Sequence, residues 1–180
     1  VILSNRKNIE NIIKDETEKS DNDIFIEFLT TLEHLKEIVK IARVGLKKER
    51  RNTGIMKLKK AFVQYEPIGT IGIISPWNYP LATPLGACVE ALLAGNNIVL
   101  KPSEHTPLTM IYIKELWDKH IDYNDAFQII IGDGLAGNLL VESNKIDMIC
   151  FTGSTMVGRI IAEKCGKLLK PVILELGGKD

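Results

Sequence analysis

The sequence predicts an α/β fold, in which an open parallel sheet carries helices on both faces and N-terminal helices precede it. After residue 67, short apolar runs typical of buried strands alternate with longer segments of helical spacing. Such alternation gives right-handed crossovers between parallel strands. The 180 residues suffice for one ordinary domain, and shares of 45% hydrophobic and 26% charged residues are typical of soluble globular proteins.

The segment before that alternation is expected to be mainly helical. Residues up to about 22 are polar and charged, with Ile12 and Ile13 as the main apolar pair, which favours a helix without clear ends. From residue 24 to about 48, apolar residues recur at helical spacing and predict an amphipathic helix. We interpret the basic residues at its end as a solvated helix terminus and not as a nucleic-acid site: Lys47, Lys48, Arg50 and Arg51.

The remaining elements follow in order. A short alternating segment at 57–66 predicts an exposed strand that Pro67 closes. Gly95 ends the first helix of the α/β part, and Thr106 is a plausible N-cap of the second. The expected strands are 70–75, 97–101, 126–131, 147–151 and 172–174, and the expected helices are 80–94, 107–119, 135–141 and 155–168.

Composition narrows the classes of function. Lys plus Arg and Asp plus Glu both number 23, so net charge gives no argument for a nucleic-acid or membrane partner. No apolar run approaches the roughly 18 residues of a membrane-spanning helix. Cys88, Cys150 and Cys165 lack metal-ligand spacing, so we expect no metal site and a reducing, cytoplasmic compartment. Each is expected to be structural, and Cys165 is the one that could face solvent.

Polar or glycine-rich loops follow every expected strand. In a parallel sheet these loops share one edge, where open α/β sheets bind ligands. The five loops begin at residues 75, 101, 132, 151 and 175.

Glu175 is the leading candidate for a general base. It stands between apolar residues at the end of a strand and is followed by Gly177 and Gly178. Partial burial there would raise the pKa of the carboxyl toward neutrality, which suits a base. The alternative is a surface glutamate before a Gly-Gly turn.

Asn78 is the leading candidate for an oxyanion donor. It lies between Pro76 and Pro80, whose rings restrict the backbone, so its amide could be held in place. The alternative is an Asx turn or a helix cap. Trp77 beside it would more often serve packing than ligand contact.

Two further loops suit a dinucleotide. Lys101 and Glu104 could hold adjacent ribose hydroxyls, and the carboxylate disfavours a ribose phosphate, although the same tetrapeptide is also a common helix-entry loop. Gly153 and Ser154 precede a helix whose free N–H groups would favour phosphate, unless Ser154 or Thr155 simply caps that helix. The spacing of Gly132, Gly134 and Gly137 matches the G-x-G-x-x-G fingerprint only nominally, because no acidic residue follows about 20 residues later at a strand end.

Four of these segments together resemble the motifs of the NAD(P)-dependent aldehyde dehydrogenase superfamily. They are PWNYP at 76–80, KPSE at 101–104, FTGST at 151–155 and ELGGK at 175–179, in that family's order and at about its spacing. The resemblance implies a Rossmann-like sheet within an incomplete aldehyde dehydrogenase fold. It also implies an N-terminal fragment that ends just after ELGGK.

The resemblance implies a role for each matching residue. An aldehyde would be oxidised to a carboxylic acid through a thiohemiacetal and a thioester, with Asn78 stabilising the oxyanion and Glu175 activating water. The cofactor would be NAD, with NADP possible because Ser103 lies beside Glu104. The implied cofactor-binding residues are Ile74, Pro76, Trp77, Asn78, Lys101, Ser103, Glu104, Gly134, Gly137, Phe151, Gly153, Ser154, Val157, Leu176 and Gly177.

The family's catalytic cysteine would lie beyond residue 180, so the chain alone is expected to be inactive. The implied division is N-terminal helices at 1–52, a strand segment of an oligomerisation arm at 53–66, the NAD(P)-binding domain at 67–174 and the start of a catalytic domain at 175–180. A homodimer or homotetramer is implied for the intact protein. The alternatives are a cofactor-binding or structural module without catalysis, or an acylating semialdehyde dehydrogenase, although the latter needs no deacylating base such as Glu175.

Overall fold

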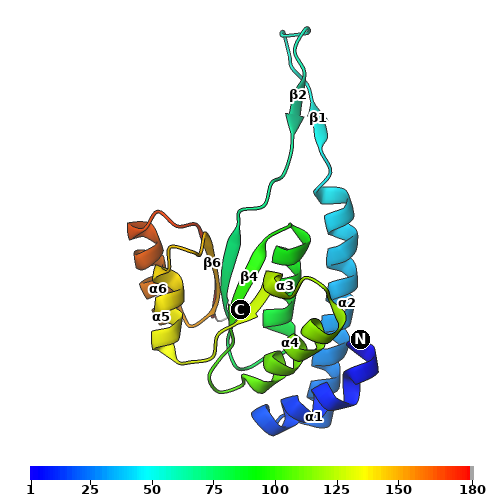
Figure 1. The fold of residues 1–180 in the computed structure, drawn as a ribbon, viewed down its shortest axis with the longest axis vertical. Helices are drawn as coiled ribbons and strands as arrows, with labels where there is room; N and C mark the ends of the chain where they lie inside the picture. The colour runs from blue at the N-terminus through cyan, green and yellow to red at the C-terminus, as the bar shows by residue number, and fades with distance from the viewer. Residues whose placement is uncertain (179–180) are drawn as a thin grey trace.

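Five parallel strands form one sheet in the order β5–β4–β3–β6–β7 (Figure 1). The computed structural model describes residues 1–178. The α/β class and the all-parallel sheet predicted from the sequence are confirmed. The strands are β3 (Thr70–Ile74), β4 (Asn97–Lys101), β5 (Phe127–Ile129), β6 (Met148–Gly153) and β7 (Val172–Leu176).

Helices cover both faces of the sheet, and each face has its own apolar core. On one face lie α3 (Ala82–Leu93) and α4 (Leu108–His120), with α1 (Arg6–Thr17) and α2 (Asp21–Gly45) packed outside them. On the other lie α5 (Gly134–Glu142) and α6 (Thr155–Lys167). Two 3₁₀ turns, η1 (Leu3–Asn5) and η2 (Asn124–Ala126), precede α1 and β5. The larger core contains Ile9, Phe28, Ile73, Leu100 and Phe127, and the smaller one contains Leu140, Ile149, Phe151, Ile161 and Cys165.

The basic segment after α2 departs from the prediction. The helix ends at Gly45 and not near residue 48, and β1 (Glu49–Arg51) pairs antiparallel with β2 (Ala61–Val63). The ammonium of Lys48 lies 4.6 Å from the centre of the Phe62 ring, which adds a cation–π contact to the pairing. Pairing with residues ten to fourteen positions later therefore makes the expected helix end one strand of a hairpin, which projects from the body of the molecule (Figure 1).

Two smaller expectations are also wrong. Cys165 is fully buried on the inner face of α6 and does not face solvent. Thr106 does not cap α4, because its hydroxyl donates to the carbonyl of Trp77.

Within residues 1–178, none of the helices combines the length and apolar content that crossing a bilayer requires.

The inner strand β4, which pairs with β3 and β5, should carry much of the stability. The side chain of Leu100 is fully buried, whereas that of Leu58 on the hairpin is fully exposed at 102%. We expect Leu100→Ala to lower the free energy of unfolding by about 2–5 kcal/mol, since it removes buried methyl groups and leaves a cavity. The matched control Leu58→Ala should change it by less than about 0.5 kcal/mol in the same urea titration. Equal effects would contradict the described core.

Candidate active site

Two adjoining clefts lie at the edge of the sheet where the strands end. The strand order reverses between β3 and β6, which is where open α/β sheets place their ligands. The Asn78 cleft, of about 540 Å³, is lined by residues 76–79, Thr83, residues 152–154 and residues 175–177. The Lys101 cleft, of about 590 Å³, extends from the same wall toward α5 and α6. Pro76, Trp77, Thr152, Gly153 and Ser154 line both clefts.

Asn78 lies in the loop between β3 and α3, residues 75–81, which we call the Asn78 loop. Its side chain is exposed to the cleft, and within residues 1–178 its amide makes no hydrogen bond. The N-cap position of α3 belongs to Leu81. Neither the Asx turn nor the helix cap therefore accounts for Asn78, and its N–H donors are available to a ligand.

Glu175 shares this cleft with Asn78 but lies inside a strand. The sequence placed it just beyond residue 174, whereas in the structure it belongs to β7 and pairs with Thr152 of β6. The predicted partial burial is wrong, because β7 is the outermost strand of the described sheet and leaves the carboxylate exposed. The carboxylate is thus open to water on the side where Asn78 lies.

Lys101 and Glu104 form an ion pair in the lining of the Lys101 cleft. The buried Lys101 ammonium donates to a Glu104 carboxylate oxygen at 3.1 Å and to the Pro102 carbonyl at 3.0 Å. A hydrogen bond from its own backbone N–H lowers the pKa of Glu104, and the ammonium lowers it further. An ionised carboxylate beside an ammonium can accept from one hydroxyl while the ammonium donates to its neighbour, as adjacent diol oxygens require.

The wall between the clefts is the turn from β6 into α6. A Cβ on Gly153 would lie 2.6 Å from the Phe151 ring, so a side chain there would require that ring to move. Ser154 caps α6, because its hydroxyl oxygen accepts from the N–H of Val157 at 3.3 Å. The Thr155 hydroxyl donates to the Gly177 carbonyl at 3.3 Å and links this turn to the segment after β7. The capping alternative for Ser154 is thus confirmed.

All the sequence-predicted site residues line one cleft or the other. Asn78, Glu175, Leu176 and Gly177 lie in the Asn78 cleft, and the others lie in the Lys101 cleft or in the shared wall. Helical spacing could have predicted several further cleft residues. Those that were missed on α5 and α6 lie on the same helix faces as the predicted residues Gly137 and Val157. The residues not predicted are Ser75, His105, Asn138, Val141, Ile160, Ile161 and Lys164 in the Lys101 cleft and Tyr79, Thr83 and Thr152 in the Asn78 cleft.

None of the three cysteines lines either cleft. Cys88 and Cys165 are buried, and Cys150 is partly buried in β6. Desolvation raises the pKa of each thiol, and the nearby Lys170 ammonium partly opposes that rise at Cys165.

Within residues 1–178, no three His, Cys, Asp or Glu side chains are grouped so that they could hold a metal ion.

Comparison with known proteins supplies the family context. The model of the aldehyde dehydrogenase family matches residues 1–180. The phenylacetaldehyde dehydrogenase of Pseudomonas fluorescens is 45% identical over 122 residues, which are 67% of this chain and 24% of that protein. A crystal structure of an NAD-dependent aldehyde dehydrogenase from Sinorhizobium meliloti superposes with a TM-score of 0.92 at 33% identity, over 99% of this chain and 35% of that one.

A Mycobacterium tuberculosis aldehyde dehydrogenase complexed with NAD⁺ gives the same TM-score, 0.92, at 29% identity. The match covers 99% of this chain and 37% of that structure. The chain therefore spans about a quarter to two fifths of the length of these relatives.

Thiol labelling should report the shielding of the cysteines. At pH 8 we expect all three thiols of the folded chain to react at least about tenfold more slowly than a free thiol, because burial and a raised pKa both reduce accessible thiolate. The same chain in denaturant should react at three sites at the free-thiol rate, as followed by absorbance with a disulfide reagent. One fast-reacting cysteine in the folded chain would contradict this description.

Proposed function

This chain belongs to the aldehyde dehydrogenase family, and we propose that it supplies the dinucleotide site, the oxyanion donor and the deacylating base for oxidation of an aldehyde to a carboxylic acid. The observation that carries the proposal is that Asn78 and Glu175 share one cleft, whose wall at Gly153 and Ser154 is also the wall of the Lys101 cleft. Donor, base and cofactor cavity are thus adjacent.

NAD is the proposed cofactor, and the Lys101 cleft suits it. Lys101 and Glu104 would hold the adenosine ribose, and the ionised carboxylate would disfavour a phosphate there. The N–H groups of Thr155 and Met156, which begin α6 and are not used by the Ser154 cap, would receive the pyrophosphate, where the helix dipole favours negative charge. When bound, the nicotinamide would supply the hydride acceptor for the oxidation. Two relatives named above are described as NAD-dependent or NAD⁺-bound.

Asn78 would act on the first intermediate. Attack of a cysteine thiolate on the aldehyde carbon breaks the carbonyl π bond and leaves an oxyanion, to which the unengaged amide of Asn78 would donate. Since Cys88, Cys150 and Cys165 are shielded and lie outside both clefts, we propose that the nucleophile is not one of them.

Glu175 would act on the thioester that remains after oxidation. Its carboxylate would take a proton from water, the resulting hydroxide would add to the thioester carbonyl, and the carbon–sulfur bond would break to release the acid. The exposed carboxylate is directly accessible to the water that it would activate.

We also propose that the β1–β2 hairpin is part of an oligomerisation arm, since Ile55, Leu58 and Phe62 on it are exposed.

Glu104 offers the direct test of the cofactor site. We expect Glu104→Gln to weaken NAD⁺ binding by the whole chain about tenfold, because a charged acceptor for the ribose hydroxyls is lost. Titration calorimetry would measure the dissociation constant, with Glu163→Gln, whose partner is Lys167 on the surface, as the matched control. Failure of the unchanged chain to bind NAD⁺, or full affinity in Glu104→Gln, would refute the assignment.

Glu175 offers the test of the chemistry, in a protein that carries this chain together with the nucleophile. We expect Glu175→Gln to leave a single turnover of NADH formation and to slow steady turnover by about 10²–10⁴-fold, since only deacylation needs the base. Stopped-flow absorbance would separate the two phases. If steady turnover kept its full rate, Glu175 would not be the deacylating base.

A further inference from the structure

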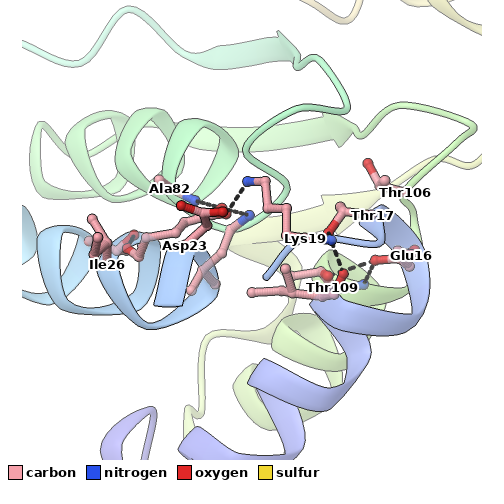
Figure 2. A network of polar contacts seen from close by, with 12 residues as sticks. Glu16, Thr17, Lys19, Asp23, Ile26, Ala82, Thr106 and Thr109 are labelled. Atoms are coloured by element: carbon pink, nitrogen blue, oxygen red, sulfur yellow. Dashed lines mark hydrogen bonds and ion pairs between the residues drawn. The ribbon is translucent and has the colours of Figure 1, made fainter. Parts of the chain in front are cut away.

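The helices that follow the two site loops begin without caps of their own. The N-cap of α3 is Leu81 and that of α4 is Pro107, and neither supplies a side-chain acceptor. The first N–H groups of a helix have no partner within the helix, so an uncapped start leaves donors to be satisfied elsewhere. In this chain, side chains of α1 and α2 meet those donors (Figure 2).

Glu27 of α2 satisfies the start of α3. One of its carboxylate oxygens accepts from the N–H groups of Leu81 and Ala82 at 3.0 and 3.2 Å, and the other pairs with the Lys19 ammonium at 2.7 Å. The side chain of Glu27 is fully buried, so these bonds replace its entire hydration. The Lys19 ammonium also lies 4.1 Å from the centre of the Tyr79 ring, next to Asn78 in the chain.

Glu16 of α1 does the same for α4. Its two carboxylate oxygens accept from the N–H groups of Leu108 and Thr109 and from the Thr109 hydroxyl, the last at 2.6 Å. Figure 2 shows Glu16 beside Thr109. Glu16 lies near the end of α1 and Lys19 lies between α1 and α2, in the part of the chain that we call the α1–α2 corner.

The segment before α4, residues 102–107, is the Glu104 loop. Its Thr106 hydroxyl donates to the Trp77 carbonyl at 3.4 Å and so joins the Glu104 loop to the Asn78 loop.

We infer that Glu27 and Glu16 are positioning residues for the two clefts: Glu27 fixes the Asn78 loop and Glu16 fixes the Glu104 loop. The inference rests on the proposed function for the meaning of those loops. Each loop starts at a strand end that the sheet holds and finishes at a helix start that a carboxylate from the α1–α2 corner holds. Negative charge at a helix N-terminus is also favoured by the helix dipole. The N-terminal helices therefore control the order of the site although none of their residues lines either cleft.

Trp77 provides a reporter within the Asn78 loop that needs neither cofactor nor activity. The chain has two tryptophans, so Trp117→Phe leaves Trp77 as the only one. In that background we expect Glu27→Gln to lower the fluorescence anisotropy of Trp77 and to speed amide exchange of Leu81 and Ala82 about tenfold, measured by NMR. Glu33→Gln is the matched control on α2, because Glu33 is exposed and pairs with the exposed Lys36.

Glu16→Gln tests the other half of the inference. It should speed exchange of the Leu108 and Thr109 amides about tenfold and weaken NAD⁺ binding, while the Leu81 amide stays protected. A general loss of stability would instead raise exchange at both helix starts together. Faster amide exchange at the start of α4 alone would therefore indicate loss of positioning, and faster exchange at the starts of both α3 and α4 would indicate general destabilisation.

Lys19→Gln serves as a second variant, in which the Glu27 carboxylate stays in place. It removes the cation over Tyr79 and leaves the buried carboxylate without its ion-pair partner, so Trp77 anisotropy should again fall. Unchanged anisotropy and unchanged Leu81 exchange in folded Lys19→Gln or Glu27→Gln would overturn the inference. If the unchanged chain fails to bind NAD⁺ while these loop effects appear, the proposed function fails and the positioning role stands.

Discussion

The parallel pairing of β3 with both β4 and β6 is the constraint on which the rest of the structure depends. Ile74 at the end of β3 is level with Lys101 on one side and with Phe151 on the other. The strands β3 and β4 therefore end at the same height, and β6 continues two residues further, to Gly153. Because the strand order reverses at this point, the loops turn to opposite faces and leave a crevice between them. Both clefts are extensions of that crevice.

Features that depend on local pattern could be predicted from the sequence. The five strands and the helices between them follow from apolar runs and helical spacing, and the loops that carry Asn78, Lys101 and Ser154 follow from the geometry of parallel sheets. The family motifs then assigned a chemical role to each loop. These predictions needed no knowledge of which side chains meet across the molecule.

The features that were missed depend on distant partners. Residues 49–51 became a strand because residues 61–63 pair with them. Glu175 is exposed because the described sheet has no strand beyond β7. Thr106 turned to the Trp77 carbonyl, and the capping of α4 fell to Glu16, 92 residues earlier. Nor does a charged residue within an amphipathic helical pattern reveal that it is buried, as Glu27 is.

The order of synthesis gives the capping by α1 and α2 a further meaning. Both carboxylates precede the helices whose starts they satisfy, so a growing chain presents the acceptors before the donors are made. The two contacts span 54 and 92 residues, so closing them costs chain entropy whenever they form. Because the carboxylates are synthesised first, each new helix start meets its acceptor as soon as it packs on the N-terminal segment.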